Sequence, residues 1–161
     1  MSEDAIKRDY IRVKAIGLIR RNDQLLLEEV REPDGPLIGY RPLGGSIEFG
    51  EKSWEALERE FMEELGEDIK ITKLYTVLEN IFTWDNKPAH EVIFVYEASL
   101  LNKDTYQEQI VERMDSITGN MRQAYWVNPH ALPEGVKLLP TTLMDHLDKP
   151  MDWSPSRDCC H

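Results

Sequence analysis

The sequence has few cysteines, few basic residues and no long apolar run. Its 161 residues include only two cysteines, the adjacent Cys159 and Cys160. Two neighbouring cysteines cannot close a useful loop, so a disulfide-stabilised scaffold is excluded. No apolar segment approaches the roughly 20 residues that a membrane-spanning helix needs, and residues 1–8 are too polar for a signal peptide. We therefore expect a soluble intracellular, cytoplasmic protein.

Positive charge is scarce. Lys and Arg number 19 against 30 Asp and Glu, for a net charge of −11. This charge argues against a nucleic-acid backbone or an anionic membrane as partner. A nucleotide stays compatible, because bound cations can mediate contact with phosphates. The length predicts a single domain over residues 1–161 that is large enough to bury a core, with a flexible tail over residues 149–161.

The acidic residues concentrate between Gly44 and Glu67. This segment holds eight Glu against one Lys and one Arg, a net charge of −6 and thus more than half of the −11 of the whole chain. A Gly-rich loop opens it and a helix is predicted behind the loop, because Ser53 is suited to the N-cap and Gly66 to a left-handed end. One stripe of this helix is apolar and should face the core: Trp54, Leu57, Phe61 and Leu65.

Three carboxylates, those of Glu60, Glu63 and Glu64, fall together beside the apolar stripe. Like charges at these spacings cost roughly 0.2–0.5 kcal/mol per pair, and Glu63 and Glu64 also meet the unfavourable end of the helix dipole. A divalent cation would remove this cost, and an oxygen-only site suits Mg²⁺ or Mn²⁺. The alternative is a solvated acidic face, as on most helices with charge runs. The adjoining apolar stripe, the Gly-Gly loop and the placement of Arg59 favour the cation.

The rest of the chain reads as strands around this helix. Predicted strands cover residues 10–20, 24–30, 68–84, 90–101 and 123–128, with a hairpin turn at Asp85–Pro88. Residues 32–40 are predicted as a loop, residues 102–120 as a loop with a short helix, and residues 138–147 as a C-terminal helix. The run over residues 90–101 should be a central strand. This order predicts an α/β fold with helices on both faces of a mixed sheet.

The spacing within the acidic segment resembles the Nudix box, the signature of hydrolases that act on a nucleoside diphosphate linked to another group. The fixed positions that match are Gly45, Glu51, Arg59, Glu60, Glu63, Glu64 and Gly66, with apolar Phe61 at its place. Glu67 departs from the aliphatic residue that is usual there, and we expect Ile69 to take over its packing. The resemblance implies the Nudix α/β/α sandwich with a mixed β-sheet, as the wider architecture also suggests.

The resemblance also implies roles for these residues. Metal ligands would be Glu60 and Glu64, with Glu63 close by and the carbonyl of Gly44 completing the shell of a Mg²⁺ or Mn²⁺ ion. Catalytic roles fall to three residues: Glu63 as one candidate base, Arg59 as its orienting partner, and Glu51, which would fix the loop-to-helix turn or a second metal. In other members the base lies outside the box, and here Glu91 or Glu97 are the alternatives.

Substrate identity is less accessible. The subgroup markers downstream of the box are not met, since Phe82 and Trp84 stand near those places. Arg31, Arg41 and Lys87 are candidates for phosphate contacts. The leading function is a metal-dependent pyrophosphohydrolase on a nucleoside diphosphate derivative. Two alternatives are a non-catalytic nucleotide or metabolite sensor and a scaffold whose acidic helix binds a basic partner; a homodimer is compatible with this family.

Overall fold

The computed structural model describes residues 10–147, and the tail expected over residues 149–161, with its two cysteines, lies outside the described residues. Nine strands form one mixed sheet in this part of the chain. They are β1 (Arg12–Arg21), β2 (Gln24–Arg31), β3 (Leu37–Pro42), β4 (Gly44–Ser46), β5 (Ile69–Trp84), β6 (Lys87–Leu100), β7 (Ile110–Met114), β8 (Met121–Val127) and β9 (Lys137–Leu138). The helices are α1 (Ser53–Leu65), α2 (Met144–Leu147) and two short 3₁₀ turns, η2 (Lys103–Gln107) and η3 (Thr141–Leu143).

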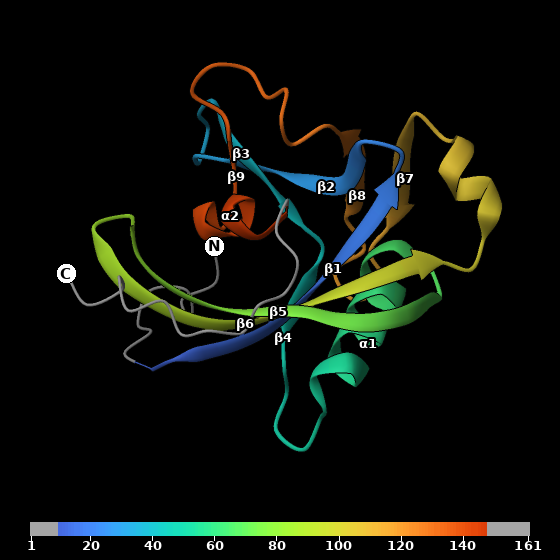
Figure 1. Ribbon diagram of the computed structural model, residues 1–161, viewed down its shortest axis with the longest axis horizontal. Helices are drawn as coiled ribbons and strands as arrows, with labels where there is room; N and C mark the ends of the chain where they lie inside the picture. The colour runs from blue at the N-terminus through green and yellow to red at the C-terminus, as the bar shows by residue number, and fades with distance from the viewer. Residues whose placement is uncertain (1–9, 148–161) are drawn as a thin grey trace.

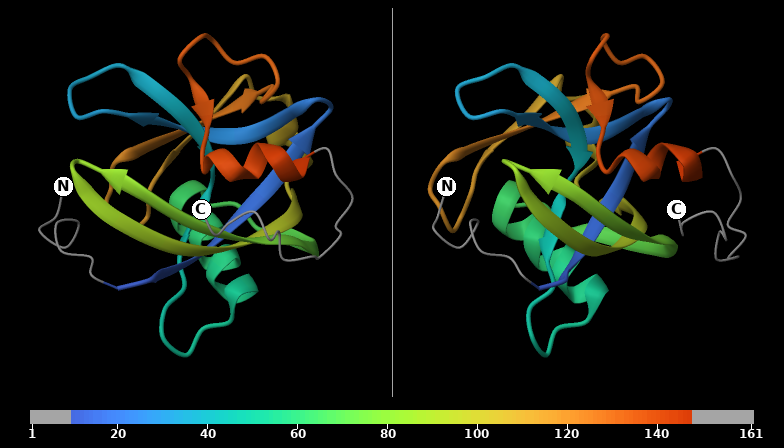
Figure 2. Two further views of the ribbon diagram at one scale, coloured as in Figure 1. Left: turned by 60° about the vertical axis from the view of Figure 1, so that its left-hand side comes forward. Right: turned by 90° about the vertical axis from the view of Figure 1, so that its left-hand side faces the viewer.

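The main path of the sheet runs β5-β6-β1-β2-β3-β9, with β4 paired to β1 and the β7–β8 hairpin paired to β2. Strands β1 and β6 are parallel, as are β3 and β9, whereas the other neighbours are antiparallel. Figures 1 and 2 show α1 and α2 on opposite sides of the long β5–β6 hairpin. The expected mixed sheet with helices on both faces is confirmed, and β6 is central as predicted.

The core divides into two clusters because strand β1 is covered on both faces. Ala15 and Ile19 pack with the apolar side of α1 in one cluster, while Ile16 and Leu18 pack in the other, against which residues of η3 and α2 also lie. A Cβ added at Gly17 would come within 3.1 Å of the Phe61 ring, so this glycine lets α1 approach the sheet closely. Burial of each large apolar side chain contributes about 1.5–3 kcal/mol.

The central helix begins and ends close to the predicted places. Its N-cap is Lys52 rather than Ser53, and the Glu55 carboxylate accepts a hydrogen bond from the backbone N–H of Lys52 in the first turn. The Ser53 hydroxyl lies 2.6 Å from that of Tyr96 instead. Gly66 ends the helix in the left-handed conformation at φ 61°, as predicted. Within the predicted apolar stripe Trp54 is 41% exposed, whereas the other three members are fully buried.

Three expected elements were wrong, each where long-range pairing decides the structure. The loop expected over residues 32–40 contains the start of β3, which is held between β2 and β9. Residues 102–120, expected as a loop with a short helix, do contain the short helix η2, but they also contain β7, whose Val111 pairs with Ala124 of β8. The helix expected over residues 138–147 is divided among the end of β9, η3 and the short α2. Local spacing in these segments is compatible with more than one structure.

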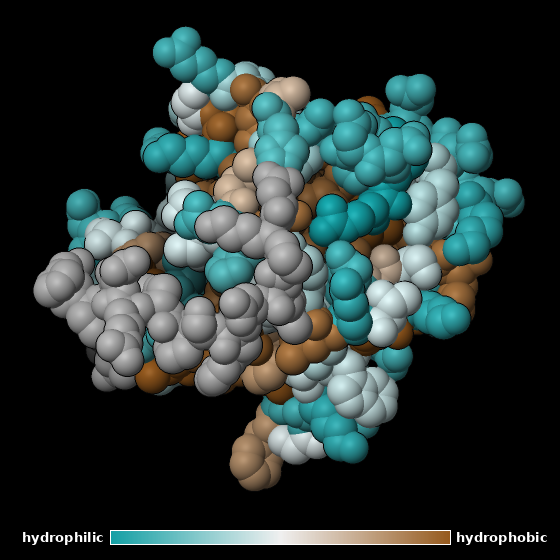
Figure 3. Space-filling view, in the orientation of Figure 1, coloured by the Kyte–Doolittle hydropathy of each residue, from teal (hydrophilic) through white to brown (hydrophobic). Residues whose placement is uncertain are grey.

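The surface view in Figure 3 shows how polar and apolar residues are distributed over one face of the described residues. On the face shown in Figure 3, hydrophilic residues cover most of the top and right, and apolar residues lie between them. Within residues 10–147, no helix is long and apolar enough to cross a membrane.

Candidate functional site

The loop-to-helix segment is brought against β1 through β4. Gly45 pairs with Ala15 of β1, and the helix that follows returns so closely that a Cβ at Gly45 would lie 2.5 Å from the Glu60 carboxylate. Gly44, at φ 151°, has no room either, because a Cβ there would lie 2.0 Å from the carbonyl oxygen of Ala15. Gly45 therefore allows a helix carboxylate to stand directly over the strand, and Gly44 allows β4 to approach the backbone of β1.

Arg59 joins three of the predicted carboxylates. It binds Glu51 through two hydrogen bonds of 2.8 and 3.0 Å, and its Nη1 lies 3.0 Å from Glu60 and 3.2 Å from Glu63. Its Nη2 also donates to the carbonyl of Ser46. These bonds, above all the one with Glu51, raise the pKa of Arg59 and lower the pKa of Glu51. The guanidinium thus stays charged and ties the loop to the helix, with Glu51 as its main anchor.

Glu64 lies on the neighbouring side of the helix, in a more buried place. Only 5% of the residue is exposed, and Oε1 is 2.6 Å from Nη2 of Arg122 on β8. Its other oxygen, Oε2, is buried without a hydrogen-bond partner among the described residues. Burial, and next the negative charge of Glu28 on β2, raise the pKa of Glu64 to about 8, although Arg122 opposes the shift.

A divalent cation fits this donor set. The carboxylates of Glu60 and Glu64 are hard oxygen ligands, and a buried carboxylate oxygen without a partner is a costly feature that a cation would relieve. In the described part of the chain, however, no three His, Cys, Asp or Glu side chains stand close enough to hold an ion as they lie. Arg59 and Arg122 bind the carboxylates instead, so an ion would have to draw the ligands closer together.

The two alternative bases outside the box occupy different places. Glu91 is buried on β6 and forms ion pairs with Arg12 at 3.6 Å and Lys14 at 3.9 Å. Glu97 pairs with Arg20 and Lys73 toward the other end of the same strand. Glu91 therefore stands at the cleft described next, and Glu97 does not line it.

A cavity of about 840 Å³ opens between β1, β3, the β5–β6 hairpin and η3, and no box carboxylate lines it. Its lining residue Arg12 donates to the hydroxyl of Ser46, whose carbonyl accepts from Arg59. Four cationic side chains and three aromatic ones are among its lining residues: Arg12, Lys14, Arg41, Lys87, Phe82, Trp84 and His90. Burial lowers the pKa of Lys14 to about 8, while the nearby Glu91 works against this shift. Of the cations named from the sequence, Arg31 does not line the cavity and pairs with Glu29.

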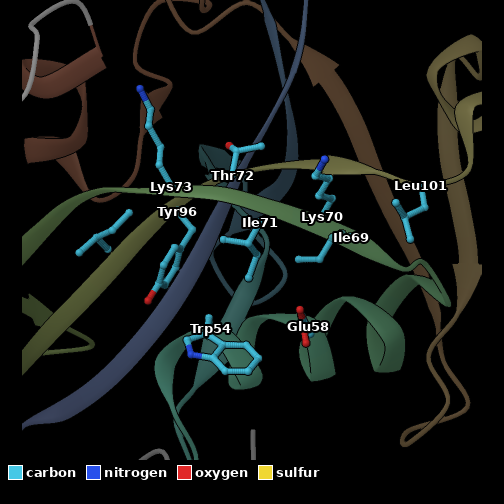
Figure 4. Close-up of a pocket in the computed structure, with 10 residues that line it drawn as sticks. Trp54, Glu58, Ile69, Lys70, Ile71, Thr72, Lys73, Tyr96 and Leu101 are labelled. Carbon is cyan, nitrogen blue, oxygen red and sulfur yellow. The ribbon is translucent and has the colours of Figure 1, made fainter.

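A second cavity, of about 560 Å³, lies between α1 and the edge strand β5. Figure 4 shows Ile71 and Tyr96 pointing from the sheet toward Trp54 on the helix, whereas Lys73 points away. Glu58 is the only carboxylate among its lining residues, and it is not a member of the box. No box carboxylate is among the lining residues of either cavity.

Several site residues were missed from the sequence: Glu28, Arg122, Arg12 and Lys14. Glu28 follows three leucines in a predicted strand, and Lys14 stands within another apolar strand. A charged residue inside an apolar strand is a usable signal, because burial of an unpaired charge is costly. Arg122 carried no such signal, since it lies in a polar stretch.

Comparison with known proteins is consistent with the fold and the box. A family model described as NUDIX domain matches residues 11–153. A MutT NUDIX hydrolase from Burkholderia pseudomallei is similar in structure at a TM-score of 0.62 and 22% identity, covering 86% of this chain and 99% of that one. A NUDIX hydrolase from Nitrosomonas europaea has a TM-score of 0.55 and 18% identity, covering 74% and 73%. An ADP-ribose pyrophosphatase from Streptococcus suis has a TM-score of 0.50 and 16% identity, covering 81% of each chain.

Proposed function

This chain belongs to the NUDIX domain family and is a hydrolase of that family, and on this premise we propose that it cleaves the pyrophosphate bond of a nucleoside diphosphate linked to another group. The reaction uses a divalent cation, Mg²⁺ or Mn²⁺. One observation carries the proposal: the box carboxylates gather around Arg59, and Ser46 connects Arg59 to a cavity lined by cationic and aromatic side chains. The carbonyl of Ser46 accepts from Arg59, and its hydroxyl accepts from Arg12 in the cavity wall. A cytoplasmic location is part of the same proposal.

Glu60 and Glu64 are the proposed metal ligands, with Glu63 close by and the carbonyl of Gly44 as a further oxygen donor. When bound, the ion supplies positive charge that offsets the negative charge on the phosphoryl oxygens as phosphorus is attacked. The buried Oε2 of Glu64 and the contact of Gly45 with Glu60 support this assignment.

The remaining chemistry falls to the chain's own residues. Glu63, held 3.2 Å from Arg59, accepts a proton from the attacking water, whose oxygen bonds to one phosphorus as the bridging P–O bond breaks. Arg59 orients that carboxylate, and Glu51 anchors Arg59 to the loop. Glu91 is the alternative base, and it lines the cavity with Arg12 and Lys14 both paired to its Oε1.

The larger cavity is the proposed substrate site. Its volume of about 840 Å³ lies within the range of roughly 300–1,000 Å³ typical of ligand pockets. Arg12, Lys14 and Arg41 would contact phosphate oxygens, while Phe82 and Trp84 offer faces for a base to stack on. Among the similar structures is that of a UDP-X diphosphatase, at 17% identity and a TM-score of 0.55 over 89% of this chain and 64% of that one. A diphosphate bridge between two groups is therefore the substrate feature to test first.

The test is turnover of a substrate panel by the full chain. The panel contains ADP-ribose, NADH, diadenosine polyphosphates, nucleoside triphosphates and nucleotide sugars, each with Mg²⁺, with Mn²⁺ and with chelator. Metal-dependent release of a nucleoside monophosphate is expected, and Glu64→Gln should lose it while remaining folded. Undiminished turnover in that variant, or in chelator, would refute the proposed metal role. Binding of a panel compound without turnover in Mg²⁺ would instead identify the sensor.

A further inference from the structure

Arg122 reaches the box helix from a distant part of the chain. It lies on β8, and its guanidinium meets three carboxylates from separate elements. Nη2 is 2.6 Å from Oε1 of Glu64, Nη1 is 3.8 Å from Glu28 on β2, and Nε is 3.5 Å from Asp115 in the β7–β8 turn. Two-thirds of the Arg122 side chain is covered, since 34% is exposed. Only the contact with Glu64 is at hydrogen-bond distance; the other two are longer ion pairs, and Nε is buried without a hydrogen-bond partner among the described residues. Glu64 is therefore the main partner of this arginine.

The contact distinguishes the two oxygens of Glu64. Oε1 is occupied by Arg122, whereas Oε2 is buried and has no partner among the described residues. A carboxylate that was paired only for stability would gain by satisfying both oxygens, because an unpaired buried acceptor is costly. An ordered carboxylate with one oxygen held and the other left open is the arrangement expected of a metal ligand with an outer partner.

We propose that Arg122 is a positioning residue for the metal site: it holds Oε1 of Glu64 so that Oε2 is presented to the divalent cation. Arg122 itself touches neither the substrate nor the ion. This inference rests on the proposed metal role of Glu64.

The β7–β8 hairpin supplies its own control. Arg113 is the direct cross-strand partner of Arg122, and it binds a second buried carboxylate, that of Glu67, at 3.3 Å, just beyond the end of the helix. It also binds Glu108. Glu67 has a hydrogen bond from Thr105 as well and is no proposed ligand. The two arginines therefore match in strand register and in the anchoring of the hairpin, and they differ in which carboxylate they hold.

The experiment measures Mn²⁺ affinity by isothermal titration calorimetry and by the electron paramagnetic resonance signal of free Mn²⁺, with no substrate present. Wild type, Arg122→Ala, Arg122→Lys and Arg113→Ala are compared as full chains. Removal of an outer partner of a metal ligand weakens binding by roughly 10–100-fold. We expect a weakening in that range for Arg122→Ala, a smaller one for Arg122→Lys, which keeps the charge, and wild-type affinity for Arg113→Ala.

Each outcome is decisive. Equal affinity in Arg122→Ala and wild type would overturn the positioning role, and tighter binding would show that Arg122 competes with the cation. An equal weakening in Arg113→Ala would trace the effect to general loosening of the hairpin and would also overturn it. If Arg122→Ala does not fold, as judged by circular dichroism, Arg122→Lys is compared with Arg113→Ala. Weaker Mn²⁺ binding in Arg122→Lys alone supports the positioning role, and equal affinity in the two variants overturns it. Failure of the wild type to bind Mn²⁺ would refute the proposed function itself, which separates that result from the others.

Discussion

Gly45→Ala tests whether the Glu60 carboxylate must stand over β4. The new Cβ would lie 2.5 Å from both Cδ and Oε1 of Glu60, whereas ordinary contacts begin near 3.4 Å, so the carboxylate must move by about 0.9 Å. The movement would also lengthen the 3.0 Å hydrogen bond from Arg59. A misplacement of about 1 Å in a catalytic site can cost roughly 100-fold in rate.

The cost in stability should be much smaller than the cost in rate. The obstructing atoms are the end of a flexible side chain, which can turn away without a shift of the backbone, so we expect a loss below the roughly 1–3 kcal/mol of core overpacking. The matched control is Gly17→Ala, whose Cβ would meet the Phe61 ring at 3.1 Å. This control should lower the melting temperature and leave the rate nearer to wild type.

The assay pairs kcat on the preferred panel substrate, at saturating Mg²⁺, with thermal unfolding followed by circular dichroism. We expect kcat for Gly45→Ala to fall about 100-fold, as estimated for a misplaced group. Wild-type kcat in a folded Gly45→Ala protein would refute the reasoning, because the displacement of Glu60 would then have no catalytic consequence. A loss of kcat that merely follows the loss of stability in both variants would refute it as well.

Three further predictions follow from the same contacts. The pKa of Glu64 is raised to about 8, so the native state binds more protons than the unfolded state between about pH 4.5 and 8. The metal-free protein should therefore lose stability as pH rises through this window. Urea unfolding at pH 5 and pH 8 should show this loss for wild type and not for Glu64→Gln. Arg59→Lys keeps the charge but cannot reproduce the paired hydrogen bonds to Glu51. The kcat should therefore fall at least roughly tenfold while Mn²⁺ affinity changes less. An unchanged kcat would contradict the orienting role. Arg41→Ala and Trp84→Ala should raise KM more than they lower kcat; an unaltered KM in both would place the substrate outside the cavity.

Much of the local structure was accessible from the sequence because its signals are local. Gly66 ends the helix as predicted, since a left-handed residue is needed there. The turn between β5 and β6 has Asp85 and Asn86 at positive φ, the conformation that favours these residue types. Ile69 joins the core as expected, although Glu67 is buried as well, with Thr105 and Arg113 as partners. The spacing of the box residues is likewise a local signal, because they lie in one continuous loop and helix.

The predicted elements that were wrong depend on partners far along the chain. Ile110 and Met114 of β7 are spaced as on a helix, yet they are exposed while Val111 between them is buried against β8. Strand β3 exists because β2 and β9 supply its hydrogen bonds. Such pairing leaves little trace in a short stretch of sequence, because strand formation depends on neighbours on either side.

The sequence by itself determined the family resemblance, the acidic helix and the carboxylates and glycines of the box, since all of these follow from spacing within one continuous segment. Only the tertiary structure decided which oxygens are held and which are open. Glu28, Glu64 and Arg122 meet because β2 pairs with β8 while the helix packs beside them. The cavity, with Lys14 and Glu91 in its wall, likewise arises from strands paired across long separations. Long-range sheet pairing buries these charges together, and burial strengthens the interactions between them and shifts their pKa values.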